Sequence, residues 1–130
     1  MSPAARSNKL ILIADDQPVG RELIRAILES SGYEVIEAAD GQEALDKAVS
    51  NLPDLILLDL HMPQLDGFSA MKKLRSDRRF AATPIIAVTA TAMKGSREEG
   101  LQAGFTDYLT KPVPIETLRS LVARLLSAST

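Results

Sequence analysis

Cysteine is absent from this sequence of 130 residues, and histidine occurs only once. The lack of cysteine excludes disulfide bonds, cysteine-ligated zinc, iron–sulfur clusters and thiol catalysis, and it is typical of a reducing compartment. Long apolar runs are absent as well, so no segment is expected to cross a membrane. These absences favour a cytoplasmic protein without membrane attachment.

An excess of charge of one sign is also absent, because 17 acidic and 15 basic residues leave a net charge of −2. Such a chain has no general attraction to nucleic acid or anionic lipid. The short basic stretch at 77–80, DRRF, includes Asp77 and is interpreted as a solvated loop. No direct nucleic-acid partner is therefore expected.

The length and the hydrophobic fraction of 45% describe one globular domain of α/β type. Residues 9–127 are predicted to form this domain, with a flexible leader at 1–8 and a short tail at 128–130. Three continuous apolar runs, at 10–14, 55–58 and 85–88, are typical of parallel strands that are covered on both faces. Two weaker runs, at 34–38 and 107–110, are predicted to be edge strands.

Between these strands, apolar residues recur at helical spacing. Pro18 is suited to the first position of a helix, Asp40 with Glu43 resembles a capping box, and Gly32 and Gly104 suit helix ends. The residues expected on buried helix faces are Leu23, Ile24, Ile27 and Leu28; Ala44, Leu45, Ala48 and Leu52; Phe68, Met71 and Leu74; and Ile115, Leu118, Leu121, Val122, Leu125 and Leu126.

The alternation of five strands and five helices predicts a doubly wound, five-stranded parallel sheet of order 2-1-3-4-5, with helices on both faces. In such sheets the ligand site lies beyond the carboxyl ends of the strands, where the strand order reverses. Here that point lies between the first and third strands.

Polar residues stand at this edge: Asp15 and Asp16 after the first strand, Asp59 after the third, Thr89 after the fourth and Lys111 after the fifth. Each alone is also explained as a cap, turn or solvated residue. Together they indicate a site, because adjacent carboxylates about 4 Å apart repel each other by about 1 to 4 kcal/mol unless a cation is bound. Three carboxylates offer the hard oxygen ligands that Mg²⁺ prefers, whereas zinc favours histidine or cysteine.

A metal beside Asp59, the hydroxyl of Thr89 and the ammonium of Lys111 match the requirements of phosphoryl transfer to a carboxylate. Asp59 is the predicted nucleophile. The metal and the ammonium would neutralise the phosphoryl oxygens, while the hydroxyl would donate a hydrogen bond to another oxygen.

Asp15-Asp16 together with LLDLHMPQLDG (57–67), VTATA (88–92) and DYLTKP (107–112) closely resembles the receiver domain of two-component response regulators, which has a flavodoxin-like fold. The resemblance implies that Asp59 accepts a phosphoryl group from a sensor histidine kinase or a histidine phosphotransfer protein. It also implies that Mg²⁺, or Mn²⁺ in its place, binds Asp16, Asp59 and the backbone carbonyl of His61, with Asp15 acting mainly through water.

The same resemblance implies roles for other residues. Thr89 and the Ala90 N–H would bind the phosphoryl group, Lys111 would pair with it, and Lys111-Pro112 would be a cis peptide. Tyr108 would be a switch aromatic that turns inward when Thr89 moves, and the surface of the fourth helix, fifth strand and fifth helix would signal to a downstream protein target. The side chains of His61 and Thr91 would tune the lifetime of the phosphate. The partner-docking surface would comprise Gln17, Gly20, Val113 and Pro114, with the exposed face of the first helix.

Other function classes fit less well. An aspartyl-nucleophile phosphatase needs a second aspartate two residues after the nucleophile, where this chain has His61. A dinucleotide-binding fold needs a glycine-rich loop after the first strand, where this chain has acidic residues. A phosphorylation-independent adaptor stays open in principle. We therefore expect a signalling protein, a monomer or weak dimer, that catalyses only its own phosphorylation and slow dephosphorylation. A stand-alone regulator and a receiver from a larger protein such as a hybrid kinase are both consistent with this sequence.

Overall fold

Strands and helices alternate along the chain, as the apolar pattern predicts. The computed structural model describes residues 8–90 and 96–128, so Thr91 and nearly all of the predicted leader and tail lie outside the described residues. The elements are β1 (Leu10–Ala14), α1 (Pro18–Ser30), β2 (Glu34–Ala38), α2 (Gly41–Asn51), β3 (Leu55–Asp59), α3 (Gly67–Arg75), a short 3-10 helix η2 (Arg78–Phe80), β4 (Ile85–Thr89), α4 (Ser96–Ala103), β5 (Asp107–Thr110) and α5 (Ile115–Ala128).

The strands form a parallel sheet in the order β2-β1-β3-β4-β5, which confirms the predicted topology. Ala14 of β1 stands opposite Leu58 of β3, and Asp59 stands opposite Val88 of β4. Asp59 and Thr89 are the last residues of their strands rather than the first residues of the following loops. Their backbones are therefore fixed by the sheet.

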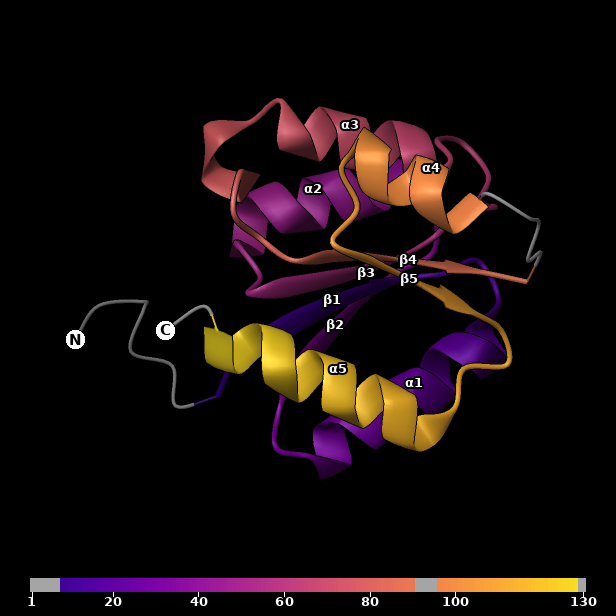
Figure 1. The fold of residues 1–130 in the computed structure, drawn as a ribbon, viewed down its shortest axis with the longest axis vertical. Coiled ribbons are helices and arrows are strands. Elements are labelled where there is room, and N and C mark those ends of the chain that lie inside the picture. Colours follow the sequence, from indigo (N-terminus) through magenta and orange to yellow (C-terminus); the bar gives the residue numbers. More distant parts are fainter. Residues whose placement is uncertain (1–7, 91–95, 129–130) are drawn as a thin grey trace.

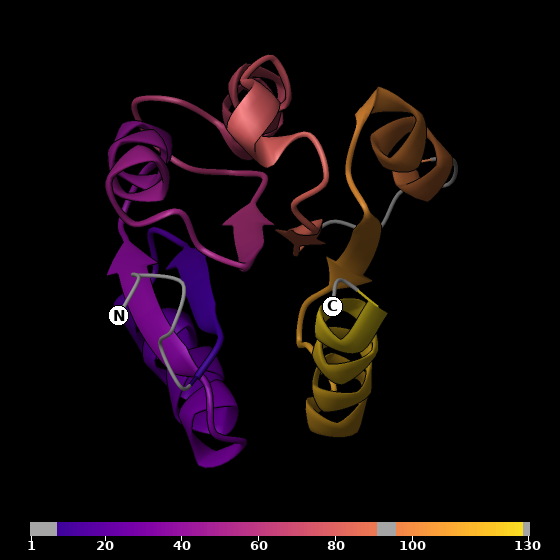
Figure 2. The ribbon, with the colours of Figure 1, turned by 90° about the vertical axis from the view of Figure 1, so that its left-hand side faces the viewer.

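Helices cover both faces of the sheet, with α1 and α5 on one side and α2, α3 and α4 on the other (Figure 1). Figure 2 shows the same two layers after a quarter turn. Side chains alternate between the faces along each strand. Ile11 and Ile13 pack toward α1 and α5, whereas Leu12 and Ala14 pack toward the opposite helices. In the described part of the chain, none of the helices is long and apolar enough to cross a membrane.

Helix starts follow the sequence signals. Pro18 occupies the first turn of α1, and Asp40 accepts a hydrogen bond from the Glu43 N–H at 2.8 Å. The Glu43 carboxylate accepts from the Ala39 N–H at 2.6 Å, one residue before the cap. These contacts satisfy backbone N–H groups that a helix start leaves unpaired.

Three predicted core positions are wrong: Leu23, Leu52 and Ile115 are 59%, 49% and 47% exposed. Leu23 lies about a quarter turn from the centre of the buried stripe on α1, at about 100° per residue. Leu52 follows the end of α2 in a left-handed conformation and leaves the helical stripe. Ile115 is the first residue of α5, one turn before Leu118, the first buried residue of that helix.

Candidate functional site

The predicted site residues converge at the carboxyl ends of the central strands. Within residues 8–90 and 96–128, Asp15, Asp16 and Asp59 form a group in which one carboxylate oxygen from each residue lies within 4.8 Å of the other two. Asp15 and Asp59 are buried, at 2% and 5% exposure, because Asp15 directly follows β1 and Asp59 ends the neighbouring strand β3, in a sheet covered on both faces. Asp16 is exposed at the rim. Two carboxylates of the group are thus buried, and the third is open to solvent.

Lys111 places its ammonium between the two buried carboxylates. Its Nζ lies 2.8 Å from Asp15 Oδ2 and 2.9 Å from Asp59 Oδ2. The Lys111 backbone N–H donates to the Thr89 carbonyl at 2.7 Å, and the Lys111-Pro112 peptide is cis, as the resemblance implies. The loop after β5 is thereby held against the end of β4.

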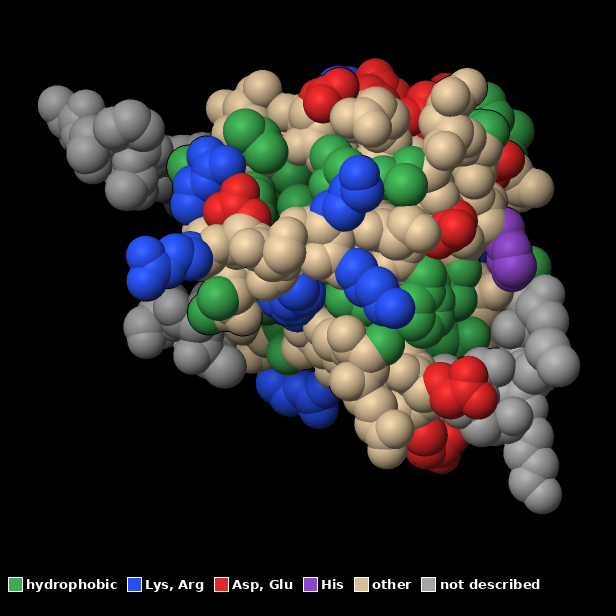
Figure 3. Space-filling view, turned by 90° about the horizontal axis from the view of Figure 1, so that it is seen from above, with side chains coloured by type: hydrophobic (Ala, Val, Ile, Leu, Met, Phe, Trp, Pro, Cys, Tyr) green, Lys and Arg blue, Asp and Glu red, His purple; other side chains and the backbone are tan. Residues whose placement is uncertain are grey.

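Each buried carboxylate also accepts from a backbone N–H two residues later. The Gln17 N–H donates to Asp15 Oδ1 and the His61 N–H donates to Asp59 Oδ1, both at 2.9 Å. In such a turn, the backbone of the loop that carries the aspartate also fixes the direction of its carboxylate. The side chain of the single histidine stands out on the surface (Figure 3).

Burial raises the pKa of Asp59, and the His61 N–H and the Lys111 ammonium oppose that shift. For Lys111, burial lowers the pKa, but the hydrogen bonds to Asp15 and Asp59 outweigh it, so its pKa is raised. The ammonium is therefore firmly protonated and serves as the internal counter-ion of the carboxylates. The donor set of three carboxylates, one of them exposed, fits a hard cation such as Mg²⁺.

Thr89 and Ala90 lie beside this group. Thr89 ends β4 and is buried, and Ala90 follows it at the exposed rim. Asp59 pairs with Val88 in the sheet, so Thr89 stands one residue further toward the rim on the neighbouring strand. Thr89 and Ala90, which are predicted to bind the phosphoryl group, thus lie at the end of the strand next to the predicted nucleophile, Asp59.

Tyr108 lies inward in this structure, with 7% exposure, on the face of the sheet that α4 covers. A Cβ atom at Gly100 would lie 3.1 Å from the Tyr108 ring, so helix and ring are closely packed. The predicted inward turn of Tyr108 stays a prediction. The ring already occupies the position that the prediction assigns to the signalling state.

The predicted docking residues share the rim. Gln17 and Pro114 are exposed, while Gly20 and Val113 are half-buried. They lie at or just before the starts of α1 and α5, which pack against each other on one face of the sheet (Figure 1).

Sequence reasoning missed two residues that support the site. Gly67 begins α3 where a Cβ atom would lie 2.2 Å from the Asp59 carbonyl oxygen. The Asp66-Gly67 pair is a turn signal, but nothing in the sequence shows which backbone it approaches. Arg21 of α1 donates to the Asp15 carbonyl at 2.7 Å. The separation of six positions between Arg21 and Asp15 in the sequence allows this contact, but nothing in the sequence predicts it.

A 2-1-3-4-5 parallel sheet with an acidic cluster and a lysine at its carboxyl edge defines the receiver class of signalling domains. Residues 11–123 match the response regulator receiver domain, and the chain belongs to that family. Members of this family are signalling proteins rather than enzymes in the ordinary sense.

Similar proteins include single-domain and kinase-borne receivers. The polar-differentiation response regulator DivK of Brucella ovis is 41% identical over 116 residues, which cover 86% of this chain and 94% of DivK. The receiver domain of the sensor histidine kinase PA1611 from Pseudomonas aeruginosa is 40% identical, with a TM-score of 0.85 over 93% of this chain and 99% of that one. That structure holds a magnesium ion in its active-site cleft. The chemotaxis protein CheY4 of Vibrio cholerae is 35% identical, with a TM-score of 0.85 over 92% and 99% of the two chains.

Proposed function

We propose that Asp59 of this receiver takes a phosphoryl group from a phosphohistidine in a Mg²⁺-dependent reaction. The observation that supports this most is the burial of Asp59 within the acidic group, 2.9 Å from the Lys111 ammonium. A buried carboxylate with a fixed cation beside it is prepared for a reaction in which negative charge arrives at that point.

In the proposed reaction, an oxygen of Asp59 forms a bond to phosphorus as the bond between phosphorus and the histidine nitrogen breaks. The released imidazole of the partner takes up a proton. Lys111 pairs with one phosphoryl oxygen, and the Thr89 hydroxyl and the Ala90 N–H donate to others. Bound Mg²⁺, or Mn²⁺, would neutralise phosphoryl charge, held by Asp16, Asp59 and the His61 carbonyl, with Asp15 acting through water.

Incubation with acetyl phosphate and Mg²⁺ tests the proposal, with incorporation followed by intact mass. We expect one phosphoryl group per chain, no incorporation in Asp59→Asn, and none when a chelator removes the metal. Asp46→Asn is the matched control, because Asp46 lies exposed on α2, where its carboxylate accepts a hydrogen bond from the Gln42 side chain. Undiminished incorporation in Asp59→Asn would contradict the assignment.

The family implies a histidine kinase partner, and we propose that α1 receives it. Val19 and Leu23 on this helix are 81% and 59% exposed, and the helix begins two residues after Asp16. Their exposure on a helix that buries Ile24, Ile27 and Leu28 on its other side is typical of a protein contact. The surface would comprise these residues with Gln17, Gly20, Val113 and Pro114.

Leu23→Ser tests this surface. Transfer from a phosphorylated histidine phosphotransfer protein should slow, while uptake from acetyl phosphate should not change, since the small donor needs no docking. Val49→Ser is the control, because Val49 is a similarly exposed apolar residue on α2, at 46%. Gly20 is less suitable for this test, since a side chain longer than that of alanine would extend beside the Asp15 carboxylate, whose Oδ2 lies 3.8 Å from the position of a Cβ atom. Equal slowing with both donors would show damage to the site instead.

We further propose a cytoplasmic monomer or weak dimer that contacts no nucleic acid directly. Its output to a downstream protein target, or onward relay of the phosphate, would use the surface of α4, β5 and α5.

A further inference from the structure

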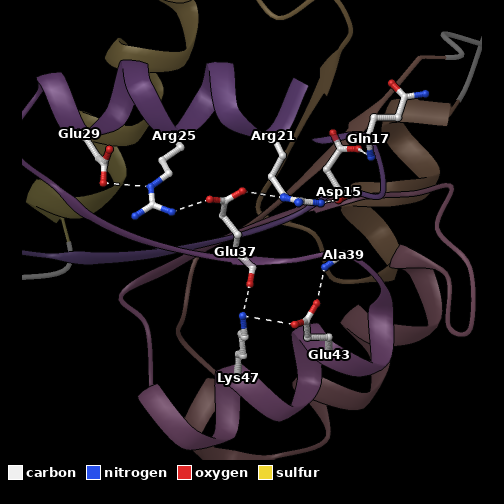
Figure 4. Close-up of polar contacts among 9 residues, drawn as sticks. All are labelled: Asp15, Gln17, Arg21, Arg25, Glu29, Glu37, Ala39, Glu43 and Lys47. Atoms are coloured by element: carbon white, nitrogen blue, oxygen red, sulfur yellow. Dashed lines mark hydrogen bonds and ion pairs between the residues drawn. The ribbon is translucent and has the colours of Figure 1, made fainter. Parts of the chain in front are cut away.

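Arg21 connects the acidic group to the edge strand β2. Its guanidinium donates to the Asp15 carbonyl oxygen at 2.7 Å through Nη1 and to Glu37 Oε1 at 2.6 Å through Nε (Figure 4). The side chains of Arg21 and Glu37 are only 17% and 20% exposed. The planar, partly buried guanidinium therefore holds two acceptors on different elements in one geometry.

Glu37 is itself fixed by contacts that do not involve the site. Its other oxygen accepts from Arg25 Nη1 at 2.5 Å, and Arg25 also pairs with Glu29 at 3.0 Å. Lys47 of α2 donates to the Glu37 backbone carbonyl (Figure 4). The carboxylate and the backbone carbonyl of Glu37 are thus both held, and Arg21 has a rigid partner.

The Asp15 carbonyl belongs to the peptide that links Asp15 to Asp16. On the Asp15 side, the backbone N–H donates to the Ala38 carbonyl at 3.0 Å, and the carboxylate is held by Gln17 and Lys111. The exposed carboxylate of Asp16 depends on how this peptide is oriented, because the peptide plane sets the direction in which the next side chain leaves the backbone.

We propose that Arg21, fixed by Glu37, is a positioning residue that orients the Asp15-Asp16 peptide and so directs the Asp16 carboxylate toward Mg²⁺. This inference rests on the proposed function, in which Asp16 is a metal ligand. Residues that hold metal ligands in place commonly change metal affinity on the order of tenfold or more when they are replaced.

A purely electrostatic role for Arg21 predicts the opposite change in Mg²⁺ affinity when Arg21 is replaced. A positive charge near three carboxylates competes with a bound cation, so removing that charge alone would tighten Mg²⁺ binding. Positioning predicts that the same removal weakens binding. The direction of the change therefore separates the two roles.

Mg²⁺ titration of the full chain, followed by calorimetry and by the amide resonance of Asp16, tests the proposal. Arg21→Gln should bind Mg²⁺ on the order of tenfold more weakly than the unaltered protein. Arg25→Gln is the matched control: Arg25 shares Glu37 and the same helix but makes no contact with Asp15 among the described residues. Its Mg²⁺ affinity should stay close to that of the unaltered protein.

A second measurement uses the metal-free protein. In chelator, the amide resonance of Asp16 should move more in Arg21→Gln than in Arg25→Gln, because only the first substitution releases the Asp15 carbonyl. Urea unfolding of both variants shows whether they are folded under the titration conditions. If Arg21→Gln does not fold, Arg21→Lys replaces it and should also weaken Mg²⁺ binding, since one ammonium cannot hold both acceptors in the same geometry.

Unchanged or tighter Mg²⁺ binding in a folded Arg21 variant would overturn the inference. Equal weakening in Arg25→Gln would overturn it as well, because the effect would then follow helix stability rather than the Asp15 contact. Failure of the proposed function gives a different result, since the unaltered protein itself would then bind no Mg²⁺ or take up no phosphate.

Discussion

Asp59 shows how single residues build this site. Its backbone belongs to β3, one carboxylate oxygen accepts from the His61 N–H, and the other faces Lys111. The space behind it is filled by α3, whose first residue, Gly67, donates its N–H to the Leu60 carbonyl at 3.2 Å. A nucleophile held from all of these directions needs little rearrangement before reaction.

Gly67→Ala should destabilise the protein, because its Cβ atom would lie 2.2 Å from the Asp59 carbonyl oxygen and the backbone would have to shift. A loss of about 1–3 kcal/mol in the free energy of unfolding is expected from such overpacking. Urea unfolding measures it.

Gly20→Ala is the contrasting variant at the residue scale. A Cβ atom there makes only an ordinary contact of 3.8 Å, and the position is helical. This substitution should raise stability by up to about 1 kcal/mol through helix propensity. Equal effects of the two substitutions would contradict the close approach at Gly67.

Sequence reasoning reached the residues that the fold itself aligns. Asp59 and Thr89 end their strands and Asp15 directly follows β1, so a correct strand assignment places them at one edge without any knowledge of side-chain contacts. Arg21 and Gly67 were not reached. Their roles depend on how far a side chain extends from α1 and on how closely α3 approaches β3, and neither is encoded in periodicity.

At the scale of elements, α4 is the helix best suited to move. Gly100 is its buried residue against Tyr108, and an interior glycine lowers helix stability by about 1 kcal/mol relative to alanine. Arg97 of α4 binds the Tyr108 carbonyl at 2.9 Å and the Asp107 carboxylate at 2.8 Å. A change at β5 therefore reaches α4 through both packing and polar contacts.

Thr89→Ala tests whether the site controls this helix. Beryllofluoride with Mg²⁺, which mimics the phosphoryl group, should shift amide resonances of the unaltered protein from Arg97 to Tyr108 as well as at Asp59. Thr89→Ala should lose the distant shifts, because the hydroxyl that responds to the phosphoryl group is gone. Thr83→Ala, beyond the other end of β4, is the control. Distant shifts that survive in Thr89→Ala would exclude this coupling.

At the scale of the whole molecule, the continuous apolar strands determine both the sheet order and the two helix layers. The three runs covered on both faces had to be central, which left β2 and β5 as edges. The exposed apolar residues were predicted less well. Leu23 was expected in the core beside Ile24, and only the orientation of α1 on the sheet shows that it faces solvent.

Acid should weaken the folded molecule partly through Glu37. The hydrogen bond from Arg25, and then that from Arg21, hold the pKa of Glu37 below its ordinary value. An acidic group whose pKa is lowered by folding stabilises the fold at a pH above its pKa in the unfolded chain, which is about 4.3 for glutamate. This stabilisation is lost as the pH falls through the pKa of the group in the folded protein. Glu37→Gln should therefore lower stability at pH 7, and the deficit should shrink as the pH falls below about 4.

Urea unfolding over this pH range measures the difference between Glu37→Gln and the unaltered protein. Glu22→Gln, on the exposed side of α1, accounts for the general effect of removing one negative charge. A deficit that stays constant into acid would show that the ion pairs of Glu37 do not contribute as described.

The central claim is that Asp59 is the residue that carries the phosphoryl group, and chemical trapping locates it most directly. Borohydride reduces an aspartyl phosphate to homoserine, which peptide mass spectrometry identifies by position. After incubation with acetyl phosphate and Mg²⁺, the account predicts homoserine at position 59 and none when the metal is withheld. Homoserine at position 15, 16 or 54 instead, or an unmodified position 59 in a protein that has gained phosphate, would contradict it.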